Sequence, residues 1–329
     1  MARTQKPRRN MLLPVMFTTI PLIYGTAAVA ELKSEPIKPI PLSVSLDQRK
    51  VKLGKELFHD KRLSKDNTVS CSTCHDLNKG GTDHLKVSVG IKSQSGNINS
   101  PTVFNSGFNF RQFWDGRAPD LEEQAIAPIE NPVEMGSSMP EVIGKLKRDN
   151  NYVRWFEDIY PDGISPKNVK NALAIFQQSL ITPNSRFDQY LRGNNTAITE
   201  FEKRGYQLFK NYGCVACHQG MNVGGNMYQK FGVLNDYFGK RGNITQADLG
   251  RYNVTGDERD KHVFKVPSLR LVALTPPYLH DGSAKTLREA VDVMFEFQLG
   301  RHAPEEDKNA IVAFLTTLAG DLSAWESTK

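Results

Sequence analysis

Two Cys-x-x-Cys-His pentapeptides restrict what this chain can fold into more than any other feature of its 329 residues. They contain all of its cysteines and run from Cys71 to His75 and from Cys214 to His218. This motif is typical of c-type haem attachment, in which both thiols bond to the porphyrin and the adjacent histidine binds the iron. The sequence therefore predicts two covalently bound haems, with Cys71, Cys74, Cys214 and Cys217 as attachment points and His75 and His218 as iron ligands.

Other uses of these cysteines fit the pattern less well. Disulfide pairing does not require a histidine directly after each second cysteine. A zinc site with four thiolate ligands does not require His75 or His218. A thioredoxin-like redox site needs a strand–helix–strand context, which this sequence lacks.

The first 30 residues predict a secretory signal peptide. The basic residues Arg3, Lys6, Arg8 and Arg9 precede an apolar stretch at 11–24 and the small residues Ala28-Val29-Ala30. The apolar stretch is short for a membrane-spanning helix and contains two prolines. Because c-type haem is attached after export of an unfolded chain, we expect cleavage near Ala30 and a periplasmic location.

The charge of the mature chain bears on its partners. Positions 1–30 carry four basic and no acidic residues, so their removal lowers the formal net charge from +6 to +2. No tract of Lys and Arg with interleaved aromatic residues is present, so nucleic acid is not expected as a partner.

An internal repeat precedes the two haem motifs. Gly54-x-x-Leu57-Phe58 comes before the first motif, and Gly205-x-x-Leu208-Phe209 comes before the second. Residues 31–44 are rich in proline and predict an extended arm, and residues 219–262 predict a long polar loop. Apolar periodicity predicts helices over 47–58, 119–126, 140–149, 166–180, 287–297 and 305–318. We therefore expect an all-α fold of two cytochrome c-like domains, residues 31–185 and 186–329, with long loops and little β structure.

Three further motifs resemble those of the bacterial dihaem cytochrome c peroxidases, a family that includes the MauG-like proteins, which oxidise protein side chains. The motifs are Phe113-Trp114-Asp115-Gly116-Arg117-Ala118, Asn131-Pro132-Val133-Glu134-Met135 and Pro277-Tyr278-Leu279-His280-Asp281-Gly282. The resemblance extends from about residue 48 to 320. It implies that the N-terminal haem is the site of hydrogen peroxide reduction and that the C-terminal haem stores an electron. It also implies a small c-type cytochrome or a cupredoxin as electron donor, and a homodimer.

The same resemblance assigns roles to individual residues. Met294 matches the axial methionine of the C-terminal haem iron, and Trp114 matches a tryptophan between the haems. Glu134 matches the catalytic carboxylate and Gln124 the distal glutamine, since a carboxylate can take a proton from one peroxide oxygen and deliver it to the other. A calcium site is matched by Asn99, Thr275 and Pro277, and calcium prefers oxygen ligands of this kind.

One position departs from the family pattern. Many members carry a histidine sixteen residues after the first motif, where it caps the peroxide haem until the second haem is reduced. Here that position is Ile91, which cannot bind iron. We therefore expect an open first haem and turnover without prior reduction, with His84 as the alternative cap. His280 is expected near the peroxide haem.

Two other functions stay open at this point. A dihaem electron carrier without an open site requires Met135, Met139 or His84 to cap the first iron. A MauG-like enzyme that oxidises a partner protein requires a tyrosine ligand on the second haem. Met294 argues against that reading, although Tyr278 lies nearby in the sequence.

Overall fold

The computed structural model describes residues 1–2 and 35–322. The predicted signal peptide falls almost entirely outside the described residues. From Glu35 onward the described residues form one compact unit. None of the described helices is both long enough and apolar enough to cross a membrane.

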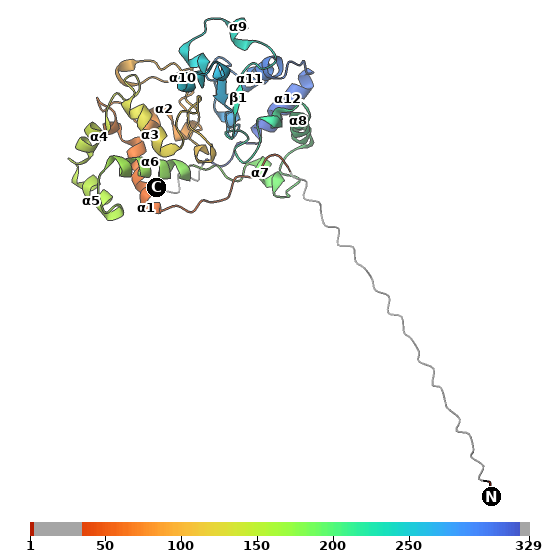
Figure 1. Ribbon diagram of the computed structural model, residues 1–329, viewed down its shortest axis with the longest axis horizontal. Coiled ribbons are helices and arrows are strands. Elements are labelled where there is room, and N and C mark those ends of the chain that lie inside the picture. Colours follow the sequence, from red (N-terminus) through yellow and green to blue (C-terminus); the bar gives the residue numbers. More distant parts are fainter. Residues whose placement is uncertain (3–34, 323–329) are drawn as a thin grey trace. The chain divides into compact units, whose positions relative to one another are not determined.

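The fold is rich in helix and poor in strand (Figure 1), so the all-α class is confirmed in its coarse form. The α-helices of the described residues are α1 Gln48–His59, α2 Cys71–Cys74, α3 Leu121–Glu130, α4 Met139–Leu146, α5 Asn150–Ile159, α6 Pro166–Ser179, α7 Arg186–Leu191, α8 Glu200–Asn211, α9 Tyr237–Arg241, α10 Tyr252–Thr255, α11 Leu287–Val293 and α12 Glu305–Thr316. The strands β1 Tyr228–Lys230 and β2 Val263–Lys265 pair in antiparallel fashion. Shorter turns are η1 Lys61–Leu63, η2 Leu77–Lys79, η3 Ile91–Ser93, η4 Ser106–Phe108, η5 Cys214–Ala216, η6 Gln246–Leu249, η7 Glu258–Asp260, η8 Val272–Leu274 and the π-helical turn η9 Met294–Gln298.

The two helices that precede the haem motifs begin with well-formed N-terminal caps. Asp47 accepts a hydrogen bond from the backbone of Arg49 at the start of α1. Thr199 and Glu202 form a reciprocal capping box at the start of α8. Each cap satisfies backbone donors that would otherwise lack partners, and so it fixes where the helix begins.

The repeat in the sequence corresponds to a repeated helix contact. Gly54 of α1 lies against the backbone carbonyl of Ala172 in α6, and Gly205 of α8 lies against that of Ala310 in α12. A side chain at either glycine would overlap the facing carbonyl oxygen. In both helix pairs, α1/α6 and α8/α12, a glycine therefore lets the two backbones come close together.

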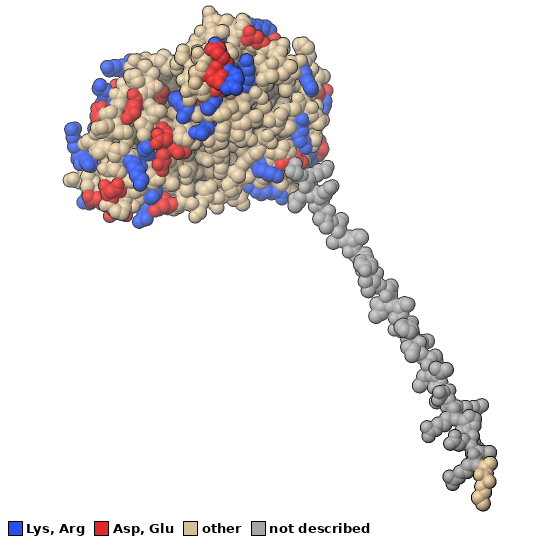
Figure 2. All heavy atoms as spheres, viewed as in Figure 1, with Lys and Arg blue, Asp and Glu red and all other residues tan. Residues whose placement is uncertain are grey.

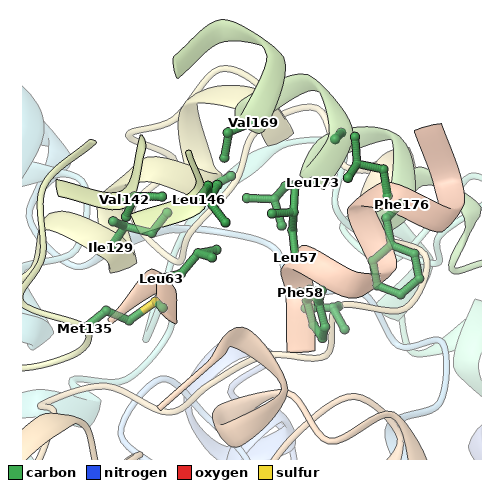
Figure 3. Close-up of a cluster of buried hydrophobic side chains, with 14 of the residues drawn as sticks. Leu57, Phe58, Leu63, Ile129, Met135, Val142, Leu146, Val169, Leu173 and Phe176 are labelled. Atoms are coloured by element: carbon green, nitrogen blue, oxygen red, sulfur yellow. The ribbon is translucent and has the colours of Figure 1, made fainter. Parts of the chain in front are cut away.

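Buried apolar side chains form two main clusters. In the N-terminal cluster (Figure 3), Leu57 and Phe58 of α1 meet Leu173 and Phe176 of α6. The second cluster is built largely on α8 and α12, where Tyr206, Phe209 and Phe314 pack together. The division into domains at residues 185 and 186 stays a prediction, because the described residues from Glu35 onward cluster as one unit.

The proline-rich arm is extended over its described part and packs against the second cluster. Ile37 and Ile40 are buried, and the N–H of Lys38 donates to the carbonyl of Gly220 at 3.2 Å. Behind the arm, the fully buried Arg270 pairs with Asp188 at 2.9 Å. Paired burial of this kind satisfies both charges, so the arm is anchored on a fixed surface.

The prediction of a long polar loop at 219–262 was wrong in part. This segment contains β1, α9 and α10, and Tyr237 and Phe238 form a third cluster with Phe264 and Phe297. These elements are too short to show a helical period, and their aromatic residues are buried by contacts with distant segments. The helix α5 was also not predicted, and the predicted helix at 140–149 ends at Leu146.

Acidic and basic side chains are interspersed on the face shown in Figure 2. The ion pairs of the described residues include that of Arg204 with Asp307 at 2.9 Å, which is open to solvent on the arginine side. Exposed pairs of this kind contribute little to stability. On this face of the described residues, no single sign of charge dominates.

Candidate active site

Each haem motif opens onto a cavity of its own. Cys71, Cys74 and His75 line the first cavity, of about 260 Å³. Cys214, Cys217 and His218 line the second, of about 210 Å³. Since a water needs only ~10–15 Å³ by this kind of measure, both cavities have room for a larger group. The cysteines are not bonded to one another, and their separation into two cavities argues against one zinc ion with four thiolate ligands.

The two motif histidines are oriented in the same way. Nδ1 of His75 lies 3.2 Å from the carbonyl oxygen of Gly81, and Nδ1 of His218 lies 3.2 Å from that of Val223. Because a carbonyl only accepts, each Nδ1 donates and each Nε2 is left for a metal. Burial lowers the pKa of both histidines, that of His218 to about 4, which favours the neutral form that binds iron.

The thiols do not have the character of redox cysteines. Burial raises the pKa of Cys71 to about 12 and that of Cys74 to about 11. Reactive Cys-x-x-Cys sites show the opposite shift, since they must form a thiolate. The thioredoxin-like alternative is therefore disfavoured.

Glu134 and Gln124 line the first cavity together with His75. Helix α3 presents Gln124, and the turn after α3 presents Glu134. The side chain of Asn131 donates a hydrogen bond of 2.6 Å to Oε1 of Glu134 and accepts one of 3.1 Å from the backbone of Val133. Burial raises the pKa of Glu134, and the nearby Arg117 and the bond from Asn131 oppose that rise. The arrangement thus places a carboxyl group of raised pKa in the same cavity as His75.

Ile91, which stands where many members of the resembled family carry a histidine, does not line the first cavity. Its side chain is 4% exposed and packs against Gly136, and its N–H donates to the carbonyl of Glu134 at 2.9 Å. His84 is exposed, and its Nε2 lies 2.9 Å from the carbonyl oxygen of Leu274. Neither Ile91 nor His84 is among the described residues that line the first cavity.

The methionines take different places. Met294 begins the π-helical turn η9 and lines the second cavity with His218, and such turns are frequent at functional sites. Met135 touches the first cavity but packs among the apolar side chains of the N-terminal cluster (Figure 3). Met139 is buried in that cluster and does not line the cavity. Tyr278 lines the first cavity rather than the second, and its hydroxyl donates to the carbonyl of Val272 at 2.9 Å.

Trp114 lies where the two cavities meet. It lines both of them, as do Lys265, Pro267 and Leu279. Its indole N–H donates to the carbonyl of Asn99 at 2.9 Å, and its own carbonyl accepts from the N–H of Lys265 at 2.8 Å. These bonds fix both the ring and the backbone of Trp114.

His280 lies between the two cavities, since its carbonyl accepts from the N–H of Asn99, a residue of the first cavity. His280 lines the second cavity, beside Trp114 at 6.3 Å between ring centroids. Its Nε2 lies 2.6 Å from Asp248, whose carboxylate Arg241 also binds. Arg241 pairs with Asp281 as well, which favours a structural ion-pair network over a metal site in this cluster.

Two of the three residues matched to calcium line the first cavity. Asn99 and Thr275 line the first cavity, and Pro277 follows a cis peptide bond. The amide nitrogen of Asn99 donates to the carbonyls of Leu85 and Lys86, which turns its side-chain oxygen away from them. Oxygen donors of this kind fit the ligand preference of calcium.

Sequence reasoning assigned no role to three residues at these cavities. Asn131 and Arg117 lie within the quoted motifs, where their proximity to Glu134 could have been suspected. No local signal marks Lys265, because it reaches the cavities through the pairing of distant segments.

Comparison with known proteins gives concordant results. The family model for di-haem cytochrome c peroxidase matches residues 48–196. Cytochrome c peroxidase Ccp of Escherichia coli is 50% identical over 88% of this chain, which spans only 62% of that relative. Cytochrome c551 peroxidase of Nitrosomonas europaea is 43% identical, and the match covers 95% of this chain and 92% of that relative. The crystal structure of a MauG-like protein associated with microbial copper homeostasis superposes with a TM-score of 0.75 at 30% identity, covering 89% of this chain and 95% of that one.

Proposed function

Because this chain belongs to the di-haem cytochrome c peroxidase family and is an enzyme of that class, we propose that it reduces hydrogen peroxide to water in the first cavity. The electrons come from a small c-type cytochrome or a cupredoxin. The proposal includes two covalent haems, one in each of two cytochrome c-like domains (31–185 and 186–329), and a calcium ion at Asn99, Thr275 and Pro277. It also includes export to the periplasm with cleavage near Ala30, and a homodimer.

The observation that carries the proposal is that different kinds of side chain line the two cavities. Glu134 and Gln124 face the first cavity with His75, whereas Met294 faces the second with His218. A histidine and a methionine on one iron leave no position for a substrate and favour the reduced state. The first cavity, by contrast, contains the carboxyl group of Glu134, and its Met135 packs in the N-terminal cluster.

The residues present fit haem. Cys71, Cys74 and His75 would hold one haem and Cys214, Cys217 and His218 the other, and the bound iron supplies the site of peroxide binding and the electrons. Burial of the thiols and histidines in two separate cavities suits two independent prosthetic groups.

Glu134 performs the proton transfers. Reduction of one peroxide to two waters takes up two electrons and two protons. Burial shifts the pKa of Glu134 upward, toward neutral pH. A group whose pKa is near the working pH can both accept and release a proton. Gln124 donates a hydrogen bond to the oxygen that carries developing charge.

Trp114 supports electron transfer between the two sites. Its ring lines both cavities, and the hydrogen bond to Asn99 holds the ring in one orientation. Replacement of this ring by a small side chain would also leave a void, since aromatic side chains of this size bury a large area.

The competing functions are less well supported. A MauG-like enzyme requires tyrosine as a ligand in the second cavity, but Tyr278 lines the first and Met294 lines the second. A pure electron carrier requires a cap on the first iron. The candidate Met135 packs in the apolar cluster, Met139 does not reach the cavity, and His84 is exposed.

The test is peroxide turnover by the haem-loaded protein with a reduced small c-type cytochrome as donor. We expect turnover of peroxide with oxidation of two donor molecules per peroxide. Rapid reduction of the protein by the donor, without any reaction with peroxide, would instead support an electron carrier. Peroxide-dependent modification of an added protein, with little donor oxidation, would support the MauG-like alternative.

A further inference from the structure

Lys265 is a buried lysine at the boundary between the two cavities. It ends strand β2, and the residue is 7% exposed. Lys265 lines both cavities, as do Trp114, Pro267 and Leu279, and it is the one residue of these four that carries a charge. Its ammonium group is therefore placed where it can act on the contents of either cavity.

The side chain of Lys265 has no anionic partner among residues 35–322, where no hydrogen bond or ion pair involves its Nζ. The other deeply buried cation lining the first cavity, Arg270, pairs with Asp188 at 2.9 Å. Burial without a partner lowers the pKa of Lys265 to about 8, a value that still leaves most of the lysine protonated at neutral pH. A buried charge is unfavourable unless something compensates it, so an anion bound in the cavities would stabilise the charged form of Lys265.

A second donor in the first cavity also lacks a partner. The hydroxyl of Ser106 is buried, lines this cavity and makes no hydrogen bond with the described residues. Unpaired buried hydroxyl groups are rare in folded proteins and call for a bound group or water. Lys265 and Ser106 thus give the cavities two polar groups that have no partner among the described residues.

We infer that Lys265 binds a propionate carboxylate of haem where the two cavities meet, and that Ser106 donates to a propionate in the first cavity. The inference rests on the proposed function in one respect, namely that haem occupies these cavities. Haem offers two carboxylates besides its iron, and a carboxylate is the acceptor that an ammonium group binds best at short range. No other carboxylate lies within ion-pair distance of Lys265 among the described residues.

This position has a consequence for electron transfer. A fixed positive charge in a water-poor interior stabilises an added electron more strongly than the same charge at the surface. Lys265 therefore raises the reduction potentials of the haems near it, and it favours the reduced state on both sides of Trp114.

Spectroelectrochemical titration of the haem-loaded protein tests the inference. Lys265→Met removes the charge and keeps a similar length, whereas Lys265→Arg keeps the charge. Lys261→Met is the matched control, because it removes a lysine that is 39% exposed and paired with Glu258. For Lys265→Met we expect at least a tenfold lower ratio of reduced to oxidised haem at the wild-type midpoint, which corresponds to about 59 mV for one electron. Lys265→Arg should recover most of this change, and Lys261→Met should change the ratio less than twofold.

Infrared difference spectra of protein with haem labelled in its propionate carboxylates give a second readout. The carboxylate bands should shift in Lys265→Met and stay close to wild type in Lys261→Met. Midpoints and carboxylate bands that do not respond to Lys265→Met would overturn the inference, as would equal changes in Lys265→Met and Lys265→Arg. Midpoints that depend on chloride concentration, with unmoved carboxylate bands, would assign Lys265 to a solvent anion instead and also overturn it.

The outcome stays informative if the neutral variant loads haem poorly. Lys265→Gln provides a second neutral side chain, and haem content measured for each variant then becomes the readout. Loss of haem from both neutral variants but not from Lys265→Arg supports the charge pairing. These measurements need no peroxide, so a haem-loaded protein without peroxidase activity would contradict the proposed function and leave this inference standing.

Discussion

Asn131 donates a hydrogen bond of 2.6 Å from its side-chain amide to Oε1 of Glu134. The two residues are three positions apart in the turn that follows α3, and both line the first cavity. The bond holds the carboxylate in one rotamer while leaving its second oxygen for a substrate. Asn131 therefore acts as a positioning residue for the group that we propose to transfer protons.

Replacement of Glu134 should remove proton transfer without disturbing the fold. We expect Glu134→Gln to lower kcat/KM for peroxide by about 10²–10⁴-fold, the usual contribution of a positioned acid–base group. Glu130→Gln, at the exposed end of α3, is the matched control and should stay within twofold of wild type. Equal activity of the two variants at equal haem content would remove Glu134 from the mechanism.

The pH profile should respond to the neighbours of Glu134. Burial raises the pKa of this carboxyl, whereas Arg117 and Asn131 lower it. Loss of either neighbour therefore raises the pKa further, so the deprotonated form needed to accept a proton is lost at a higher pH. We expect the acid limb of kcat/KM to move to higher pH in Asn131→Ala and Arg117→Gln. A limb that stays in place, or moves down, would show that Glu134 is not the titrating group.

The first haem should be open in the fully oxidised protein. Ile91 cannot bind iron, its side chain is buried against Gly136, and His84 is exposed. We expect a high-spin ferric signal beside the low-spin signal of a methionine-ligated haem, and initial rates that differ less than twofold with and without prior reduction. A low-spin spectrum with two histidine ligands in the oxidised protein would refute this prediction.

The glycine contacts of the repeated helix pairs should be intolerant of a methyl group. In Gly54→Ala and Gly205→Ala the new Cβ overlaps a backbone carbonyl of the facing helix, and overpacking of this kind costs about 1–3 kcal/mol. Gly144 of α4 has no atom close to the position of a Cβ, so Gly144→Ala should stabilise the protein by about 0.5–1 kcal/mol through helix propensity. Urea unfolding of the three variants gives these differences directly. Destabilisation by Gly144→Ala of the same size would mean that the contacts are not the cause.

Stability should fall in acid because of the buried pair of Asp248 and His280. Burial alone raises the pKa of Asp248, but hydrogen bonds from Arg241, Thr245 and His280 outweigh it and hold this pKa well below the usual range. Burial also lowers the pKa of His280. Both groups therefore bind fewer protons when folded than when unfolded. Their contribution is present above the ordinary values of 6.5 for His280 and 3.8 for Asp248 and is lost as pH falls below each of them.

Urea unfolding as a function of pH separates the two groups. Asp248→Asn should be less stable than wild type at pH 7, by about 3–5 kcal/mol for a broken buried pair, and the gap should narrow below pH 4. A gap that is the same at all pH values would show that the ionisation of Asp248 does not contribute.

The residues that could be predicted from sequence are those with a local signature. The haem motifs identify His75 and His218 on their own, and the resemblance placed Glu134, Gln124 and Trp114 at a shared site. The structure brings these three residues to the first cavity, although their roles stay predictions. Helices with a clear apolar period, such as α6 and α12, were predicted to within a few residues.

What could not be predicted depends on contacts between distant segments. Lys265 becomes a boundary residue only because β2 passes beside Trp114, which lies far earlier in the chain. The bond of His280 to Asp248 and its place in the lining of the second cavity likewise depend on residues distant in the chain. The elements within 219–262 escaped detection because they are short and held by aromatic contacts made with other parts of the chain.

The paired glycine contacts also enclose the two proposed haem attachment segments. Each proposed haem attachment segment lies in the chain between the two helices that its glycine brings together, so the contact closes a loop of roughly a hundred residues around it. Closing a loop of this length costs conformational entropy that grows only slowly with the number of residues. The glycine contacts therefore tie the two ends of each proposed haem-binding segment together without restricting the length of the chain between them.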